Sequence, residues 1–211
     1  MTTTREKLLE ATLQVVVDQG IAKASARAIA TEAGVNQALV FYHFGSVDEL
    51  LAAACTYGAE QRVATHRAAL AAVTSFAELV TLAKDIHTQE LMAGNVALLS
   101  QLLAGATSHE ALGPATAAGL QLWTGEVQQV LERLLGAGAL ADLIDVPGLA
   151  KTVSAAFVGL ELYDGVDPAG ANAAFAALEQ LARLVDVLDH LNPVERTALR
   201  RRVRRASRPI A

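Results

Sequence analysis

The prolines of this chain divide its second half into segments of helical length. The first 113 residues contain no proline, and the five prolines lie at positions 114, 147, 168, 193 and 209. Proline is tolerated at the first position of a helix and is disfavoured in a helix interior. The helices predicted from this spacing run roughly over 114–136, 147–164, 168–191 and 193–206.

The amino-acid composition favours helices throughout the chain. It contains 43 alanines and 31 leucines, is 53% hydrophobic and is only 4% aromatic. Alanine and leucine lose little side-chain freedom in a helix, and an apolar fraction this high excludes a disordered chain. We therefore expect an all-α fold, with further helices near 75–92 and 95–106 on either side of Gly94.

The sequence lacks the features that mark several protein classes. The single cysteine, Cys55, permits no internal disulfide and no cysteine-based zinc site. The first residues lack the apolar stretch of a secretory signal. The longest uncharged run, 91–109, is too interrupted by polar residues to span a membrane. We expect a soluble, cytoplasmic protein that has no membrane segment.

The first 50 residues carry the start signals of four closely spaced helices. The residues expected to cap these helices are Thr3 (with Glu6), Ser25, Asn36 and Ser46 (with Glu49). Side-chain oxygens of such residues accept hydrogen bonds from the free N–H groups of a first helical turn. Gly20 and Gly34 are expected to end the first two helices. Three short helices joined by tight turns predict a helix-turn-helix unit.

The third short helix, about 37–44, is predicted to be a recognition helix for DNA. An inward face is expected for Val40, Phe41 and Phe44, and an outward face for Ala38, Leu39, Tyr42 and His43. A helix that is buried on one side has no structural need for leucine and tyrosine on the other, and the major groove admits an α-helix. The alternative is that the outward residues pack against a neighbouring helix.

The expected DNA contacts follow from the chemistry of these side chains. Gln37 could pair with adenine, and Leu39 could contact a thymine methyl group. Tyr42 and His43 could reach phosphates or base edges. Arg27 lies near the start of the second helix, which crosses the DNA backbone in helix-turn-helix proteins. The predicted DNA-binding residues are Arg27, Gln37, Ala38, Leu39, Tyr42 and His43.

The segment SARAIATEAGVNQALVFYHFGSVDEL, residues 25–50, resembles the N-terminal signature of TetR-family transcriptional regulators. The resemblance covers about residues 5–52, and a weaker one relates 155–168 to the penultimate helix and loop of many members. It implies an all-helical homodimer that binds a double-stranded DNA operator and whose C-terminal domain responds to a small-molecule effector. The expected domains are a DNA-binding domain (1–46), a ligand-binding and dimerisation domain (47–192) and a basic C-terminal helix (193–211).

Two positions depart from the family pattern. Val47 stands where the family usually has a lysine that contacts a phosphate, and Phe41 stands where it usually has a tyrosine. The first 50 residues contain four basic and six acidic residues, a net charge of −2. Because phosphate contacts supply most non-specific affinity, we expect this domain to hold DNA less tightly than a typical member does.

Residues 75–165 are predicted to enclose the effector, because their helices are apolar on nearly all sides. The candidates for ligand contact are the polar or large side chains that interrupt these helices: His87, Gln101, Trp123 and Tyr163. A place in the core or at the surface is the alternative for each of them. The scarcity of charged and aromatic residues favours a neutral or weakly acidic apolar molecule over a cationic one.

No sequence motif indicates an enzyme, a metal site or a cofactor. His87 and Glu90 lie one helical turn apart, but no second pair at matching spacing accompanies them, so we expect an exposed polar stripe. Glycine-rich phosphate loops, nucleophile elbows and HExxH sequences are absent from the chain. Two alternatives to a repressor stay open: an all-α enzyme acting on an apolar small molecule, and an unregulated architectural DNA-binding protein.

The helices expected at 147–164 and 168–191 form the predicted dimer interface. The residues expected to meet across a two-fold axis are Ala155, Gly159, Ala174, Phe175, Leu178 and Leu181. The small residues permit close approach and the larger ones supply apolar bulk, so that two copies would form a four-helix bundle. The alternative is that both helices belong only to the core of one protomer.

The C-terminal residues differ in charge from the rest of the chain. Residues 191–211 contain seven arginines and one glutamate, a net charge of +6, against −11 for residues 1–190. Asn192, Pro193 and Glu195 predict the start of a new helix. Its apolar stripe would consist of Leu199, Val203 and Ala206. We expect this helix to dock on the acidic body, and the alternatives are a contact to DNA phosphates and a solvated face.

Overall fold

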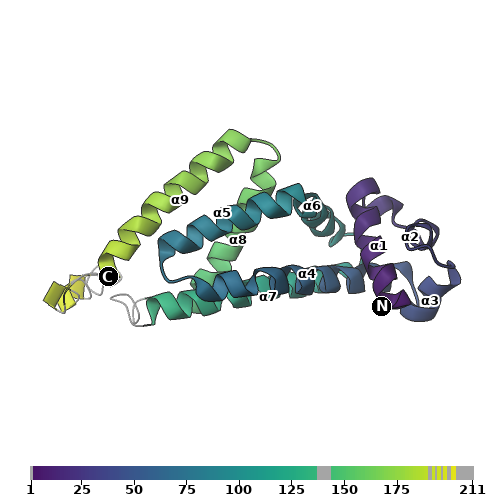
Figure 1. The fold of residues 1–211 in the computed structure, drawn as a ribbon, viewed down its shortest axis with the longest axis horizontal. Coiled ribbons are helices and arrows are strands. Elements are labelled where there is room, and N and C mark those ends of the chain that lie inside the picture. Colours follow the sequence, from purple (N-terminus) through teal and green to yellow (C-terminus); the bar gives the residue numbers. More distant parts are fainter. Residues whose placement is uncertain are drawn as a thin grey trace, which may run out of the picture. The chain divides into compact units, whose positions relative to one another are not determined.

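The computed structural model describes residues 2–136 and 144–189, together with residues 192, 194–195, 197–198 and 201–202. Within these residues the regular elements are helices, and no strand is present. The elements are α1 (Thr4–Gln19), the 3-10 turn η1 (Ile21–Lys23), α2 (Ala26–Glu32), α3 (Ala38–Phe44), α4 (Val47–Ala72), α5 (Phe76–Met92), α6 (Asn95–Gly105), α7 (Leu112–Leu135), α8 (Val146–Asp164) and α9 (Pro168–Asp189) (Figure 1). The expected all-α fold is confirmed.

Short-range capping contacts begin the helices where the sequence predicts them. The side-chain oxygen of Thr3 accepts a hydrogen bond from the N–H of Glu6 (3.2 Å), and the Glu6 carboxylate accepts one from the N–H of Thr3 (2.7 Å). These two bonds complete the expected capping box ahead of α1. Ahead of α9, the Asp167 carboxylate accepts a bond from the N–H of Gly170 (2.9 Å). Such contacts satisfy N–H groups that a first helical turn leaves free.

The chain forms two compact units. The first comprises residues 1–65 and 88–123, and the second comprises residues 66–87 and 124–211. Helices α1, α2, α3 and α6 belong to the first unit and α8 and α9 to the second, while α4, α5 and α7 contribute residues to both. A buried cluster of the second unit is formed by Leu131, Leu135 and Ala150.

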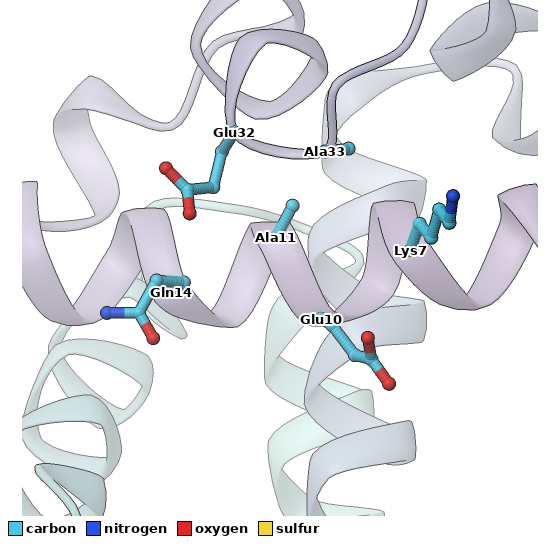
Figure 2. Close-up of a pocket in the computed structure, with 6 residues that line it drawn as sticks. All are labelled: Lys7, Glu10, Ala11, Gln14, Glu32 and Ala33. Atoms are coloured by element: carbon cyan, nitrogen blue, oxygen red, sulfur yellow. The ribbon is translucent and has the colours of Figure 1, made fainter. Parts of the chain in front are cut away.

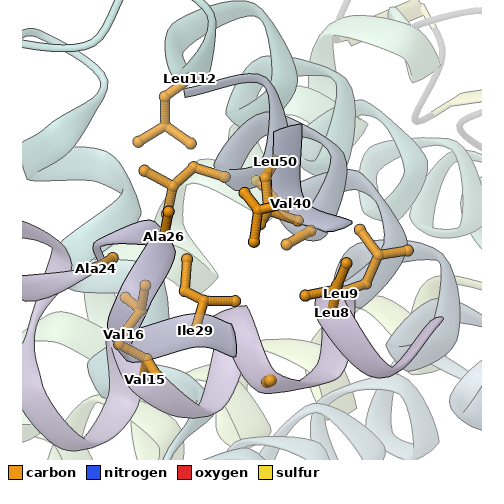
Figure 3. Packing of buried hydrophobic residues seen from close by; sticks show 14 of the residues in the cluster. Leu8, Leu9, Val15, Val16, Ala24, Ala26, Ile29, Val40, Leu50 and Leu112 are labelled. Atoms are coloured by element: carbon orange, nitrogen blue, oxygen red, sulfur yellow. The ribbon is translucent and has the colours of Figure 1, made fainter. Parts of the chain in front are cut away.

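The core of the first unit joins the N-terminal helices to α6. Its buried residues include Leu8, Leu9, Ile29, Val40, Leu50 and Leu112 (Figure 3). Leu98 and Leu102 belong to the same cluster. Burying a leucine or isoleucine side chain contributes about 1.5–3 kcal/mol. Helices α1, α2 and α3, which we call the head, therefore share one core with Leu98 and Leu102 of α6.

In the second unit, α5 and α9 lie antiparallel and are tied together by polar contacts. The Asp186 carboxylate of α9 accepts hydrogen bonds from the N–H groups of Phe76 (2.8 Å) and Ala77 (3.0 Å) at the start of α5. Further along, Lys84 of α5 lies 3.9 Å from Glu179 of α9. Because a carboxylate at a helix N-terminus also offsets the positive end of the helix dipole, Asp186 fixes where α5 begins against α9.

The C-terminal segment begins with the expected capping residues. Asn192 Oδ1 accepts hydrogen bonds from the N–H groups of Val194 and Glu195, both at 3.0 Å, and the Glu195 carboxylate accepts one from the N–H of Asn192 at 2.9 Å. The described residues that follow are helical. The remainder of the expected helix, including Pro193 and its apolar stripe Leu199, Val203 and Ala206, lies outside the described residues.

Among the described residues, no single helix has both the length and the apolar character needed to cross a membrane. The bent pair of α3 with α4 meets these two criteria jointly, on length and composition alone.

Candidate nucleic-acid interface

Helices α2 and α3 are joined by a tight turn that depends on Gly34. The N–H of Gly34 donates to the carbonyl of Thr31 (3.2 Å), and the N–H of Val35 donates to the carbonyl of Ala30 (3.0 Å). This pair of bonds is a Schellman motif, in which the residue after the helix adopts a left-handed conformation. Gly34 has φ = +64°, a region that glycine enters without steric cost. The expected helix-turn-helix unit is therefore present.

Polar side chains and a second glycine set the two ends of α3. Asn36 Oδ1 accepts a hydrogen bond from the N–H of Ala38 (2.8 Å), as its expected capping role requires. Gly45 ends the helix with φ = +78°, and its N–H donates to the carbonyl of Phe41 (2.9 Å). Ser46 then accepts from the N–H of Glu49 (3.1 Å) at the start of α4. The ends of α3 are therefore fixed by local contacts.

The orientation of α3 differs from the prediction by a rotation about its axis. Val40 is fully buried, as expected, but Phe41 is 49% exposed instead of facing inward. Leu39, expected to face outward, is half-buried and packs against the head core. Because Leu39 and Phe41 flank Val40 on opposite sides of the helix, one rotation accounts for both errors. The predicted faces of these two residues were therefore wrong: Leu39 packs on the head core while still half-buried, and Phe41 is exposed.

The exposed face of α3 carries aromatic and amide side chains. Tyr42 is 80% exposed, and its ring makes an edge-on contact with the half-buried ring of His43, at 5.0 Å between ring centres. Gln37 and Ala38 at the start of the helix are exposed, as is Arg27 on α2. The predicted DNA-binding residues are therefore all at least partly accessible to solvent, with Leu39 and His43 half-buried.

One of the few basic side chains of the head is engaged in a contact within the head. The guanidinium of Arg5 lies 5.2 Å from the centre of the Phe44 ring, a cation–π contact between α1 and the end of α3. At the start of α4, Val47 is half-buried against the head core. Its side chain supplies packing where a lysine would supply a phosphate contact.

An open groove of about 400 Å³ lies between α1 and α2. Figure 2 shows its lining, in which Lys7, Glu10 and Gln14 come from α1 and Glu32 from the end of α2. Two carboxylates against one ammonium group repel a phosphate. The polar lining also lacks the apolar walls that small-molecule sites usually have. The groove therefore fits neither a DNA phosphate nor an apolar effector.

The four ligand candidates divide between the two compact units. Gln101 and Trp123 belong to the first unit, and both are half-buried. His87 and Tyr163 belong to the second, where His87 is 6% exposed and Tyr163 is 50% exposed. The hydroxyl of Tyr163 donates to the Asp167 carboxylate (3.1 Å), and this hydrogen bond raises the pKa of Tyr163.

Gln101 contacts the head. Its Oε1 accepts a hydrogen bond from the N–H of Ile21 in η1, at 3.4 Å. One turn further along α6, Gly105 packs so closely on Ile21 that an added Cβ would lie 2.6 Å from the end of the isoleucine side chain. A larger residue at position 105 would therefore displace the end of the Ile21 side chain.

The expected exposed stripe of His87 and Glu90 is wrong, because both residues are buried. Each has a partner on another helix: Nε2 of His87 lies 3.6 Å from Asp164 Oδ2, and Glu90 Oε2 lies 3.6 Å from Arg62 Nε. These non-local partners make burial of the polar groups tolerable. In the described part of the chain, no three histidine, cysteine or carboxylate side chains are grouped so as to hold a metal ion.

Helices α8 and α9 expose most of the residues expected at a dimer interface. Ala155 and Gly159 of α8 are exposed, Leu178 and Leu181 of α9 are 38% and 57% exposed, and Ala174 is half-buried. Phe175 is an exception, with an exposed fraction of 2%. Its ring packs inside the unit against His87, at 5.5 Å between ring centres. Its assignment to the dimer interface was wrong, because a side chain buried within one protomer cannot form an intermolecular surface.

The chain is similar to known bacterial regulators in sequence and in fold. Residues 8–54 match the family model described as bacterial regulatory proteins, tetR family. A search of the curated proteins finds no significant match. A protein from Rhodococcus sp., described as a TetR-family transcriptional regulator, is 24% identical with a TM-score of 0.71, over 88% of this chain and 100% of that one.

Two further solved structures have comparable folds. A transcriptional regulator from Streptomyces coelicolor A3(2) is 26% identical with a TM-score of 0.65, over 85% of this chain and 98% of its own. The multidrug-binding protein EbrR, solved in complex with imidazole, is 25% identical with a TM-score of 0.59, over 83% of this chain and 94% of its own. The sequence match of the N-terminal residues and the fold similarity over most of the chain therefore both point to transcriptional regulators.

Proposed function

We propose that this chain, which is a TetR-family transcriptional regulator, represses transcription by binding a palindromic DNA operator as a homodimer and is released by a small apolar effector. The observation that carries the proposal is the exposed face of α3. Tyr42 and Phe41 together present a large aromatic area to solvent on a helix of seven residues. Leaving such area in water is unfavourable, and the major groove of DNA is a partner surface that an α-helix fits.

The side chains of this face are suited to particular DNA contacts. Gln37, at the start of α3, can form two hydrogen bonds with adenine, and Tyr42 can donate one to a phosphate or a base edge. The Phe41 ring can contact a thymine methyl group, the role expected earlier for Leu39. Arg27 at the start of α2 lies where that helix crosses the DNA backbone in related motifs.

Because the head has few basic residues, tight operator binding is proposed to need two heads. Four basic residues stand against six acidic ones in residues 1–50, and Arg5 is already engaged with Phe44. A single head therefore gains little from phosphate contacts. Joining two heads in one dimer makes the second binding event intramolecular and multiplies the affinity.

The proposed dimer uses the exposed faces of α8 and α9. Ala155 and Gly159 lie one turn apart on α8, and Leu178 and Leu181 supply apolar area on α9. A two-fold axis brings each patch against its own copy, which closes a four-helix bundle. Covering the exposed leucines in this way supplies the driving force for association.

The effector is proposed to act on the helices between residues 75 and 165, within the proposed 47–192 domain. EbrR is a multidrug-binding protein, and by analogy this chain binds a small molecule in its C-terminal half. The effector can release DNA only if it binds one arrangement of the two heads better than the other. Because α6 shares a core with the head, a displacement of α6 is the proposed route to the operator-binding helices.

The basic C-terminal helix, residues 193–211, is proposed to dock on the acidic part of the same chain. The capping contacts of Asn192 and the helical residues after it support a helix there. Deleting 193–211 should lower thermal stability and leave the salt dependence of operator binding nearly unchanged. A slope of log affinity against log salt that falls by about two or more would make the segment a DNA-binding arm.

Selection of bound duplexes from a random pool tests the proposal. We expect enrichment of a palindrome whose half-sites are separated by about one helical turn of DNA or somewhat more. Failure to enrich any palindrome would contradict the regulator. Binding that shows no sequence preference and no response to small molecules would support an architectural DNA-binding protein, and turnover of an apolar substrate would support an enzyme.

A further inference from the structure

His87 is buried in the second unit with one of its ring nitrogens unpaired. The residue, on α5, is 6% exposed, and its Nδ1 has no hydrogen-bond partner among the residues that the structure describes. Buried polar atoms almost always have a partner, because an unmade hydrogen bond costs the full desolvation of the atom. An unpaired buried nitrogen on a regulator of this kind therefore indicates a group that is paired in another state of the protein.

The neighbours of the ring determine which kind of group Nδ1 can bind. Nε2 of His87 lies 3.6 Å from Asp164 Oδ2. The imidazole ring also packs against the Phe175 ring, with 5.5 Å between the ring centres. A neutral imidazole has one donor nitrogen and one acceptor nitrogen, and an ionised carboxylate can only accept. Of the two tautomers of a neutral ring, the one protonated at Nε2 directs its N–H toward the Asp164 carboxylate, and this tautomer leaves Nδ1 as an acceptor.

The same face of α8 adds two features that bear on the ligand. Glu161 lies less than one turn before Asp164 and is 5% exposed, so this region already holds two carboxyl groups. An anionic ligand would be repelled by them. Ser154 lies on this face as well, about 15 Å from Asp164 along the helix axis. Its Oγ is a second buried atom that has no partner among the described residues.

We propose that the effector is a neutral apolar molecule carrying a hydroxyl, phenol or amide N–H group, which donates a hydrogen bond to Nδ1 of His87. This inference rests on the proposed regulator function and names the chemical class of its effector. Since Nδ1 is inaccessible to solvent in the described conformation, the helices around His87 must separate to admit the ligand. The effector therefore binds a more open conformation selectively, which is what release of an operator by a ligand requires.

The test compares probes that share one apolar body and differ in one polar group. Octanol, methyl octyl ether and octanoate form one series, and para-butylphenol, its methyl ether and para-butylbenzoate form a second. Calorimetric titration of the full-length protein at neutral pH should give about tenfold tighter binding of the alcohol or phenol than of its methyl ether, the effect of one hydrogen bond. The carboxylates should bind most weakly.

Two variants assign the preference to His87. His87→Phe keeps an aromatic ring beside Phe175 and removes the acceptor, so the alcohol and the ether should bind with affinities within about twofold, since no hydrogen bond then separates them. His87→Asn can place its side-chain oxygen near the position of Nδ1 and should retain the preference for the alcohol. The comparison of alcohol with ether on the unmodified protein can still reject the proposal where His87→Phe does not fold, and His87→Asn then carries the assignment to His87.

Four results would overturn the inference: equal binding of alcohol and ether, a preference for the carboxylates, an unchanged preference in His87→Phe, or no binding in either series. Operator binding is measured on the same preparations. Loss of the proposed function would appear as failure to bind the selected duplex. Binding of the duplex without discrimination among the probes would reject the effector class and leave the regulator intact.

Discussion

Gln101 of α6 accepts a hydrogen bond from the backbone N–H of Ile21, at 3.4 Å and across 80 residues of sequence. Ile21 begins η1, the short turn that joins α1 to the helix-turn-helix unit. The sequence placed Gln101 among the effector contacts. Its position also connects α6, on which the effector is proposed to act, with the segment that precedes α2.

This contact predicts a specific loss of stability. Gln101→Leu removes the acceptor and leaves the partly buried N–H of Ile21 unpaired, which should lower the free energy of unfolding by about 1 kcal/mol. Gln101→Glu keeps an acceptor oxygen and should lose less than half as much. Urea titrations followed by circular dichroism measure both variants. An equal loss in the two variants would show that the hydrogen bond is not responsible.

Tyr42 should contribute to operator affinity and little to folding. Tyr42→Ala is expected to weaken operator binding by about 1–3 kcal/mol, measured by fluorescence anisotropy. Its thermal stability should stay close to that of the unmodified protein, because the side chain is 80% exposed. Met92→Ala, which alters a residue that is 85% exposed on α5, is the matched control and should bind the operator normally. Equal weakening in both variants would argue against a DNA-reading role for α3.

Position 47 offers a gain of function. Val47→Lys places an ammonium group at the start of α4, while the aliphatic part of lysine can keep the apolar contact that valine makes. The slope of log affinity against log salt should steepen by about 0.9 for each phosphate contacted. Val47→Gln, which is similar in length and uncharged, should leave the slope unchanged. A lysine variant with an unaltered slope would show that residue 47 does not approach DNA.

The proposed dimer interface predicts that Gly159→Arg produces a monomer. The substitution places a long charged side chain on the exposed face of α8 where the proposed two-fold axis requires close approach. Sedimentation should detect a helical monomer that binds the operator poorly. Ala176→Arg is the control, since Ala176 is exposed on the polar side of α9, within two turns of Arg183. A Gly159→Arg variant that still sediments as a dimer would exclude this interface.

Two capping carboxylates predict a loss of stability in acid. Hydrogen bonds from Thr3 and Thr74 lower the pKa values of Glu6 and Glu78 respectively. Each carboxylate therefore stabilises the fold fully above its unfolded pKa, near about 4.3, and the stabilisation is lost as the pH falls through the lower folded pKa. A Glu6→Gln, Glu78→Gln variant should lose less thermal stability between neutral pH and acid than the unmodified protein does. An identical pH profile would refute the assignment.

Features that depend on neighbouring residues in the sequence could be predicted. The capping box of Thr3 and Glu6 and the caps at Asn36 and Asp167 are formed within four residues of chain, so their spacing specifies them directly. The helix-turn-helix pattern of the N-terminal residues could be predicted for the same reason, because its turns and caps are formed by residues close together in the sequence. These signals located the N-terminal helices, α3 among them.

Features that depend on how helices pack could not be predicted. The rotation of α3, which turns Phe41 outward and Leu39 inward, is set by contacts with the rest of the head core. Likewise, periodicity places Phe175 and Leu178 on similar faces of α9, yet the ring of His87, on another helix, covers only the phenylalanine. The partner of a residue such as Asp186 lies more than 100 positions away, and nothing near it in the sequence indicates that contact.

The central claim is that two copies of α3 read two half-sites of one operator. Anisotropy titrations should compare the selected palindromic duplex with the same duplex in which one half-site is replaced by unrelated sequence. Binding to the intact duplex should be about 100-fold tighter or more, because only one of the two heads finds a half-site on the altered duplex. Equal affinity for the intact and the half-replaced duplex would contradict it.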